Sequence, residues 1–146
     1  MPVPINYLAV IVGAVIQMVL GFLWYGPILG KPWMAIMGIS PEAMAQGKND
    51  PKFKRMMMRN YVLLAIGAFL MAWILDHALI FASAYLGISG VGAGLAVGFL
   101  NWLGFIAPLS LGPVLWEQKP WKLWFINAGY YLVSMLVVGV LLAVWK

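Results

Sequence analysis

Formal charge is almost absent from three long parts of this 146-residue chain. Asp76 is the only charged side chain between Asn60 and Trp116, and residues 1–30 and 123–145 carry none. A helix needs about 20 predominantly apolar residues to cross the hydrocarbon core of a bilayer. Uncharged segments of this length, separated by compact basic loops, predict a protein whose helices cross a membrane several times.

The composition favours helices as the spanning elements. Hydrophobic residues make up 64% of the chain and charged residues 9%, against about 45–50% and about 25% in soluble domains. Only helices and closed barrels satisfy all backbone polar groups inside a bilayer. A barrel strand alternates polar and apolar residues, and the run from Leu132 to Val144 does not. We expect an all-α, polytopic membrane protein with a single transmembrane domain over residues 1–146.

Four segments are long enough to span. The expected helices are Ile5 to Tyr25, Asn60 to Tyr85, Val91 to Trp116 and Trp121 to Trp145. The first is expected to be retained, because residues 1–5 lack the basic start of a signal peptide. The short link around Gly87 to Gly90 predicts a tight hairpin between the second and third helices.

The first loop is longer than a simple connection requires. Ser40-Pro41-Glu42 has the residue types that begin a helix: a serine cap, a proline at the first position and an acid in the first turn. We expect a short interfacial helix from about Pro41 to Ala45 or beyond. Gly47-Lys48-Asn49-Asp50-Pro51 should end it.

The basic residues predict the orientation. Eight of the nine lie in two loops, and only Lys146 lies at the other end: Lys31, Lys48, Lys52, Lys54, Arg55, Arg59, Lys119 and Lys122. The positive-inside rule then places both loops in the cytoplasm and both termini outside. Charges beside spans meet anionic lipid headgroups, so we expect the bilayer as partner and no nucleic acid.

Two segments suggest an internal repeat. Gly26-Pro27-Ile28-Leu29 precedes Lys31-Pro32-Trp33, and Gly112-Pro113-Val114-Leu115 precedes Lys119-Pro120-Trp121. The same order of residue types after the first and third helices predicts two helical hairpins in tandem, with repeat-like halves at residues 1–86 and 87–146. Parallel repeats of this kind are related by an axis along the membrane normal.

Small residues recur at spacings of three or four positions on three helices, and each stripe contains or reaches one polar residue. The stripes are Ala9, Gly13, Gln17 and Gly21; Ala65, Ala68, Ala72 and Asp76; and Gly90, Gly94, Gly98 and, three residues on, Asn101. Small residues at this spacing let neighbouring helices approach closely, so helix packing is the favoured interpretation. A substrate path along the same faces is the alternative.

Asp76 and His77 are the ionisable pair inside a span. An intramembrane acid suggests function, because its charge is costly away from water. Adjacent helical residues point about 100° apart, so Asp76 continues the alanine face while His77 shares a face with Leu70 and Trp73. Asp76 carries a proton or cation in one hypothesis, with His77 titrating nearby. In the other, it accepts hydrogen bonds from Gln17, Asn101 or a tyrosine of a neighbouring helix.

Other polar groups lie at membrane depth. Gln17 and Asn101 are expected near the middle and able to bond each other, with Asn127 closer to the inner side. Pro108 and Pro113 are expected to kink the third helix and leave carbonyl groups near Gly104 and Leu109 in need of partners. Ser110 is a candidate donor for one of them.

The residue inventory limits the chemistry. The chain has no cysteine, one histidine and four acids, which excludes disulfide and thiolate chemistry and leaves little for a metal site. No nucleophile–base pair can be assembled from the sequence. We therefore expect no cofactor, no metal and no catalytic residue.

Four segments together resemble a known family. They are Gly21-Phe22-Leu23-Trp24-Tyr25-Gly26-Pro27, Gly30-Lys31-Pro32-Trp33-Met34, Trp102-Leu103-Gly104-Phe105 and Ile126-Asn127-Ala128-Gly129-Tyr130. The chain resembles, over nearly its whole length, the small bacterial membrane family catalogued as domain of unknown function 1761. That resemblance implies a four-helix domain in the bacterial cytoplasmic membrane and supplies no reaction or catalytic residues. Gly26 stands where serine is equally expected.

The leading functional hypothesis is a non-enzymatic integral membrane protein that packs and assembles into homo-oligomers. The helix-packing residues would be Gly13, Gly21, Gly90, Gly94 and Gly98. The alternative is a small proton-coupled transporter or channel protomer that uses Asp76. Its candidate intramembrane polar site comprises Gln17, Asp76, His77, Asn101 and Asn127, and the sequence does not identify a small-molecule ligand.

Overall fold

A computed structural model describes residues 4–145, which are helical with connecting turns and contain no strand over that range. The all-α prediction is therefore confirmed. In chain order the elements, with η for a π-helical turn, are α1 (Tyr7–Leu23), η1 (Trp24–Ile28), α2 (Gly30–Met37), α3 (Pro41–Gly47), α4 (Pro51–Leu86), α5 (Gly90–Asn101), η2 (Trp102–Ile106), α6 (Ala107–Leu109), α7 (Gly112–Trp116) and α8 (Trp121–Val144). Lys146, expected at the outer end, lies outside the described residues.

Four helical segments are long and apolar enough to cross a bilayer, which indicates a multi-pass membrane protein. They are Tyr7–Ile28, Pro51–Leu86, Gly90–Trp116 and Trp121–Val144. Each overlaps the segment expected from the sequence. The hairpin turn also lies where it was predicted, between the end of α4 at Leu86 and the start of α5 at Gly90.

The second span begins nine residues before the expected Asn60, at Pro51. Asp50 caps the helix, its side chain accepting a 2.9 Å hydrogen bond from the Lys52 backbone N–H, and Pro51 suits the first helical position. The 36 residues of α4 span about 54 Å at 1.5 Å per residue. Because the hydrocarbon core is about 30 Å thick, the basic first turns of α4 extend beyond it.

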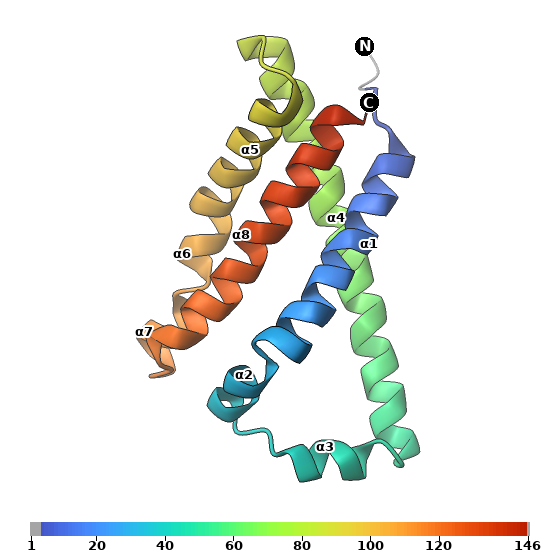
Figure 1. Cartoon of the computed structure of the whole chain (residues 1–146), viewed down its shortest axis with the longest axis vertical. Coiled ribbons are helices and arrows are strands. Elements are labelled where there is room, and N and C mark those ends of the chain that lie inside the picture. The colour runs from blue at the N-terminus through green and yellow to red at the C-terminus, as the bar shows by residue number, and fades with distance from the viewer. Residues whose placement is uncertain (1–3, 146) are drawn as a thin grey trace.

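The first loop contains two helices, of which the sequence predicted one. The expected helix is α3, whose Ser40 side chain accepts a 3.1 Å hydrogen bond from the Ala43 backbone N–H, and the chain breaks after Gly47 as predicted. The unexpected helix is α2, which ends at Gly38 in a left-handed conformation with φ of 68°. These two helices form the base that links α1 to α4 (Figure 1).

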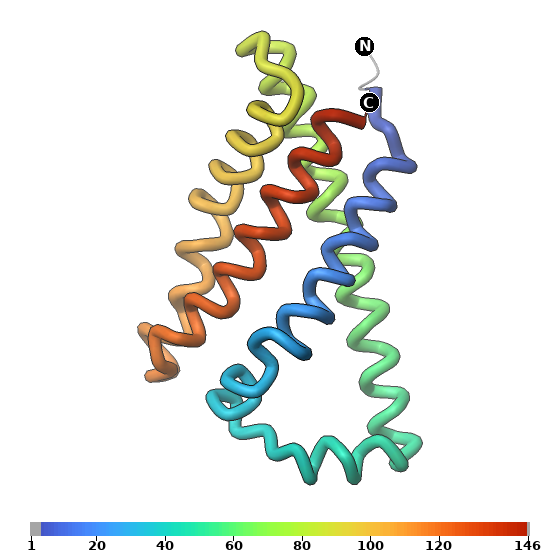
Figure 2. Tube along the Cα trace, in the orientation of Figure 1, coloured from blue at the N-terminus to red at the C-terminus, as the bar shows by residue number. Residues whose placement is uncertain are grey.

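The spans form two hairpins, α1 packing against α4 and α5 against α8. The Cα trace shows α8 lying between α1 and α5 (Figure 2). The α4–α5 turn lies at the end of the bundle where Asn6 donates a 3.4 Å hydrogen bond to the Trp145 carbonyl. Both basic loops lie at the opposite end (Figure 1), the arrangement on which the positive-inside argument depends.

Close packing of small residues joins the helices. A Cβ atom on Gly94 would lie 2.5 Å from the Gly139 carbonyl oxygen, and one on Gly98 would lie 2.5 Å from that of Met135. The backbones of α5 and α8 therefore touch at these two glycines. Gly13 and Gly21 also pack inside the chain, their Cβ positions lying 3.0 Å from Val138 Cγ1 and 3.1 Å from Tyr130 Oη respectively.

Gly90 does not have the packing role expected of it. No atom lies within 4 Å of the place its Cβ would take, and its φ of 68° puts it in the left-handed region that favours glycine. Its place is the turn that starts α5. The stripe of α5 thus packs through Gly94 and Gly98 alone.

The third span is interrupted as the prolines predicted. It passes from α5 into the π turn η2, then through the short α6, and breaks around Ser110 before α7. The Ser110 hydroxyl donates hydrogen bonds to the carbonyl oxygens of Ile106 and Ala107. Ser110 is therefore the donor that the sequence suggested, but its acceptors are not the expected carbonyls near Gly104 and Leu109.

The two segments that suggested a repeat differ in structure. Gly26-Pro27-Ile28 lies in the π turn η1, whereas Gly112-Pro113-Val114 begins the α-helix α7. The structure instead pairs η1, Trp24-Tyr25-Gly26-Pro27-Ile28, with η2, Trp102-Leu103-Gly104-Phe105-Ile106, both of which read Trp-x-Gly-x-Ile. The relation between halves 1–86 and 87–146 stays a prediction.

Candidate functional site

Asp76 lies inside the bundle. The residue is only 5% exposed, and it takes part in an interaction within the structure. It continues the buried face of α4 that carries Ala68 and Ala72, as the sequence predicted. Ala72 faces α1, where the Cβ position of Gly13 lies 3.6 Å from its own Cβ.

His77 is half-buried and makes its contacts along α4. Its Nδ1 lies 2.8 Å from the Trp73 carbonyl oxygen one turn earlier, and its ring meets the Trp73 ring edge to face at 4.7 Å between centroids. The shared face with Trp73 is confirmed. Since the imidazole is directed along its own helix, the structure does not bring it together with Asp76 as a facing pair.

Gln17 and Asn101 do not bond each other. Gln17 is 5% exposed and donates its side-chain N–H to the Met71 sulfur at 3.2 Å, while Asn101 donates to the Val97 carbonyl of its own helix at 2.8 Å. The expected pair is therefore wrong. The cause is the order of the helices, because α8 lies between α1 and α5 (Figure 2).

Asn127 belongs to a tyrosine cluster at the α1–α8 contact. The Tyr25 hydroxyl donates to Asn127 Oδ1 at 2.9 Å, and the Tyr130 hydroxyl donates to the Gln17 backbone oxygen at 2.8 Å. The two tyrosine rings pack edge to face at 5.4 Å, and Tyr25 makes a similar contact with Trp33 at 5.5 Å. The two tyrosines thus bring Gln17 and Asn127 into one cluster, while Asn101 bonds to its own helix.

Sequence reasoning missed the role of these tyrosines. Tyr25 and Tyr130 stand in two of the segments that carry the family resemblance, but nothing in the sequence pairs them. The available signal was Gly21, whose Cβ position lies 3.1 Å from the Tyr130 hydroxyl. A glycine on one helix leaves space that a large side chain of a neighbouring helix can fill.

Tryptophan side chains of the first and third spans hydrogen-bond to the backbone of α8. Trp24 in η1 donates its indole N–H to the Ile126 carbonyl oxygen at 2.9 Å, and Trp102 in η2 donates to that of Ala128 at 2.7 Å. Trp124 of α8 donates in return to the Ala107 carbonyl at 3.0 Å. The equivalent tryptophans of the two π turns thus bind α8 carbonyls two residues apart.

A groove of about 720 Å³ opens on the outside of the bundle. It is mostly apolar and runs between α4 and the η2–α6 segment, with α8 as its floor. Its lining residues are Leu70, Met71, Ile74, Leu75, Asn101, Phe105, Ile106, Leu109, Ser110, Tyr131 and Met135. All belong to the spanning segments, so Asn101, Ser110 and Tyr131 are polar groups at membrane level beside an apolar hollow.

Within residues 4–145, no three side chains of His, Cys, Asp or Glu gather closely enough to hold a metal ion. Hydroxyl, amide and indole groups donate between the spans to carbonyl oxygens and, from Gln17, to the Met71 sulfur. These bonds join neighbouring helices.

Comparison with known proteins gives one family. A family model described as "Protein of unknown function (DUF1761)" matches residues 8–143. No curated protein and no solved structure matches the chain.

Proposed function

This chain belongs to the DUF1761 family, and we propose that it is a non-enzymatic protein of the bacterial inner membrane whose role is assembly. In this proposal, protomers associate within the bilayer along the face that carries the groove between α4, η2–α6 and α8. The observation that carries the proposal is the position of Asn101 in that groove, among apolar side chains at membrane level.

The chemistry of Asn101 favours a protein partner over lipid. One of its amide N–H groups is bonded to Val97, and an asparagine amide has a second N–H and an acceptor oxygen. Lipid chains cannot bond these groups, whereas a helix of another protomer can. Such bonds between model helices in membranes contribute about 1–2 kcal/mol.

The packing of the single chain supports assembly over transport through one protomer. Backbone contact between α5 and α8 at Gly94 and Gly139 leaves no room for a substrate between those helices. The spaces beside Gly13 and Gly21 are likewise occupied by the side chains of Val138 and Tyr130. These four glycines pack within the chain, so contacts between protomers fall to the outward faces.

The test uses two isoleucines of α4 with similar exposure. Ile74 lines the groove and is 54% exposed, while Ile66 lies outside it and is 52% exposed. We expect the wild-type protein to form oligomers in bilayers, Ile74→Trp to weaken association about tenfold or more, and Ile66→Trp to leave it unchanged. Native mass spectrometry and single-molecule photobleaching in vesicles measure the distribution.

Either of two results removes the assembly proposal. One is a wild-type protein that stays monomeric at every protein-to-lipid ratio. The other is an equal effect of both tryptophan substitutions, which would show that the groove is not the interface.

Asp76 favours a second candidate, proton-coupled transport. A carboxyl group that is 5% exposed within a span is costly and is therefore retained for a reason. If transport is the function, Asp76→Asn abolishes pH-linked solute flux in proteoliposomes, and Asp50→Asn at the exposed cap of α4 does not. Flux that survives in Asp76→Asn, or its absence from the wild type across candidate solutes, rejects this candidate.

A further inference from the structure

A second hollow, of about 500 Å³, lies where α3 meets the first turns of α4. It is remote from the groove and combines lysines with large apolar side chains. Its lining residues are Met44, Lys48, Phe53, Lys54, Met57, Met58 and Tyr61. A hollow with cationic and apolar walls suits a ligand that is both anionic and apolar.

The corner has a defined shape. The Cβ position of Gly47 lies 2.9 Å from the Phe53 ring, so the end of α3 packs directly on α4. Asp50 fixes the start of α4 through its bond to the Lys52 N–H. The hollow is therefore held by local contacts that do not depend on a partner.

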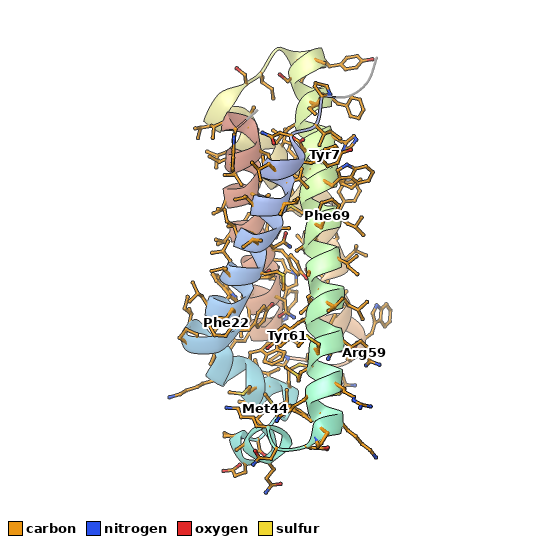
Figure 3. All side chains as sticks on the ribbon, turned by 90° about the vertical axis from the view of Figure 1, so that its right-hand side faces the viewer. Tyr7, Phe22, Met44, Arg59, Tyr61 and Phe69 are labelled. Atoms are coloured by element: carbon orange, nitrogen blue, oxygen red, sulfur yellow. The ribbon has the colours of Figure 1, made fainter. Side chains whose placement is uncertain are left out.

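The apolar and cationic residues follow one face of α4. Lys54, Met58 and Tyr61 are four and three residues apart, the spacing of neighbours on a helix surface. Lys54 lies in the first turn of α4, and Tyr61 lies farther along the helix, toward the bilayer. Figure 3 shows Met44 at the base below Tyr61, with Arg59 on the opposite side of α4.

The charges around this corner favour an anion. Residues 42–59 carry five basic side chains and two acids, 5 − 2 = +3. Lys52, Lys54 and Arg55 lie in the first two turns of α4, where the helix dipole disfavours positive charge. A bound anion would reverse that penalty, since it interacts favourably with both the cations and the helix start.

We propose that this corner binds one anionic phospholipid. Its phosphate lies between the ammonium groups of Lys48 and Lys54, and its acyl chain runs along Met57, Met58 and Tyr61. A lipid is favoured over a soluble phosphate because five of the seven lining residues are apolar or aromatic and the α4 face continues into the membrane. The site is separate from the assembly proposed above, and its test does not depend on oligomer formation.

The experiment compares two pairs of lysines that the sequence places in the two basic loops. We measure retention of phosphatidylglycerol and of phosphatidylcholine on the detergent-solubilised protein by native mass spectrometry. Wild type should retain one phosphatidylglycerol in preference to phosphatidylcholine. Lys48→Gln/Lys54→Gln should weaken that binding roughly 30-fold, from about fivefold for each lost cation, while Lys119→Gln/Lys122→Gln should leave it unchanged.

Two further variants separate charge, lipid and folding. Lys48→Arg/Lys54→Arg should retain the lipid, and Met58→Ser should weaken it without a change of charge. Equal losses in both glutamine pairs, displacement of the lipid by millimolar inorganic phosphate, or full retention in Met58→Ser would each overturn the proposal. Circular dichroism of every variant tests the fold, and the exposure of Lys48 and Lys54 leads us to expect unchanged helix content.

Discussion

The indole N–H of Trp24 donates to the carbonyl oxygen of Ile126 at 2.9 Å, joining the first span to the last. This bond has a counterpart from the third span, where Trp102 binds the Ala128 carbonyl. Both donors stand at the start of a π turn with the pattern Trp-x-Gly-x-Ile. Equivalent turns of the first and third spans therefore both bond to α8, which links these two spans.

Trp24→Phe is expected to destabilise the bundle by about 1 kcal/mol, the usual net value of one hydrogen bond. Phenylalanine keeps an aromatic ring in the same place but cannot donate. Reversible unfolding in mixed detergent micelles measures the change. Trp121→Phe is the control, since Trp121 is 56% exposed, and an equal loss of stability in both variants would show that the indole bond has no special role.

Gly94→Ala is expected to destabilise the α5–α8 contact by about 1–3 kcal/mol, the usual range for overpacking. The new methyl group would lie 2.5 Å from the Gly139 carbonyl oxygen, so one backbone must move. Gly92→Ala is the matched control two residues away. Its Cβ position has no atom within 4 Å, and alanine is the better helix former, so stability should stay or rise.

The order of these two alanine variants is the informative result. Thermal unfolding in one detergent ranks them directly. A Gly92→Ala protein less stable than Gly94→Ala would contradict the close contact between α5 and α8.

The spans and turns could be predicted because their signals are local. The lengths of the uncharged runs give four helices, and the Ser40 cap gives α3. The helix α2 was not predicted from the sequence, although its proline, Pro32, is compatible with a helix start. Pro32 is the third residue of α2, where no intrahelical partner exists for a backbone N–H, so proline costs nothing there.

The contacts of the polar residues could not be predicted, because they depend on which helices are neighbours. Gln17 and Asn101 have similar depths, but α8 separates them, and each finds its partner elsewhere. The tyrosine cluster joins residues more than a hundred positions apart in sequence. Residue spacing gives the face of one helix and not the identity of the helix opposite.

Tyr25 and Asn127 should be energetically coupled through their 2.9 Å hydrogen bond. Tyr25→Phe, Asn127→Ala and the double variant form a double-mutant cycle. The expected coupling is about 0.6 kcal/mol, the average for hydrogen bonds between membrane helices. Additive effects would mean that the bond contributes nothing beyond packing of the Tyr25 ring.

The absence of cysteine makes the orientation directly testable. Ala45→Cys in α3, Glu117→Cys after α7 and Ser89→Cys in the α4–α5 turn each introduce a single thiol at an exposed position. The basic residues predict that the first two are cytoplasmic and the third is outside. In intact cells, a membrane-impermeant maleimide should therefore label only Ser89→Cys, and permeabilisation should make the other two reactive.

The structure puts Ala45 and Glu117 at one end of the bundle and Ser89 at the other (Figure 1). Labelling of Ala45→Cys and Glu117→Cys without permeabilisation would reverse the orientation but keep this geometry. Opposite behaviour of those two variants would contradict the arrangement of the spans itself, because a chain that crosses the membrane four times must return both loops to one side.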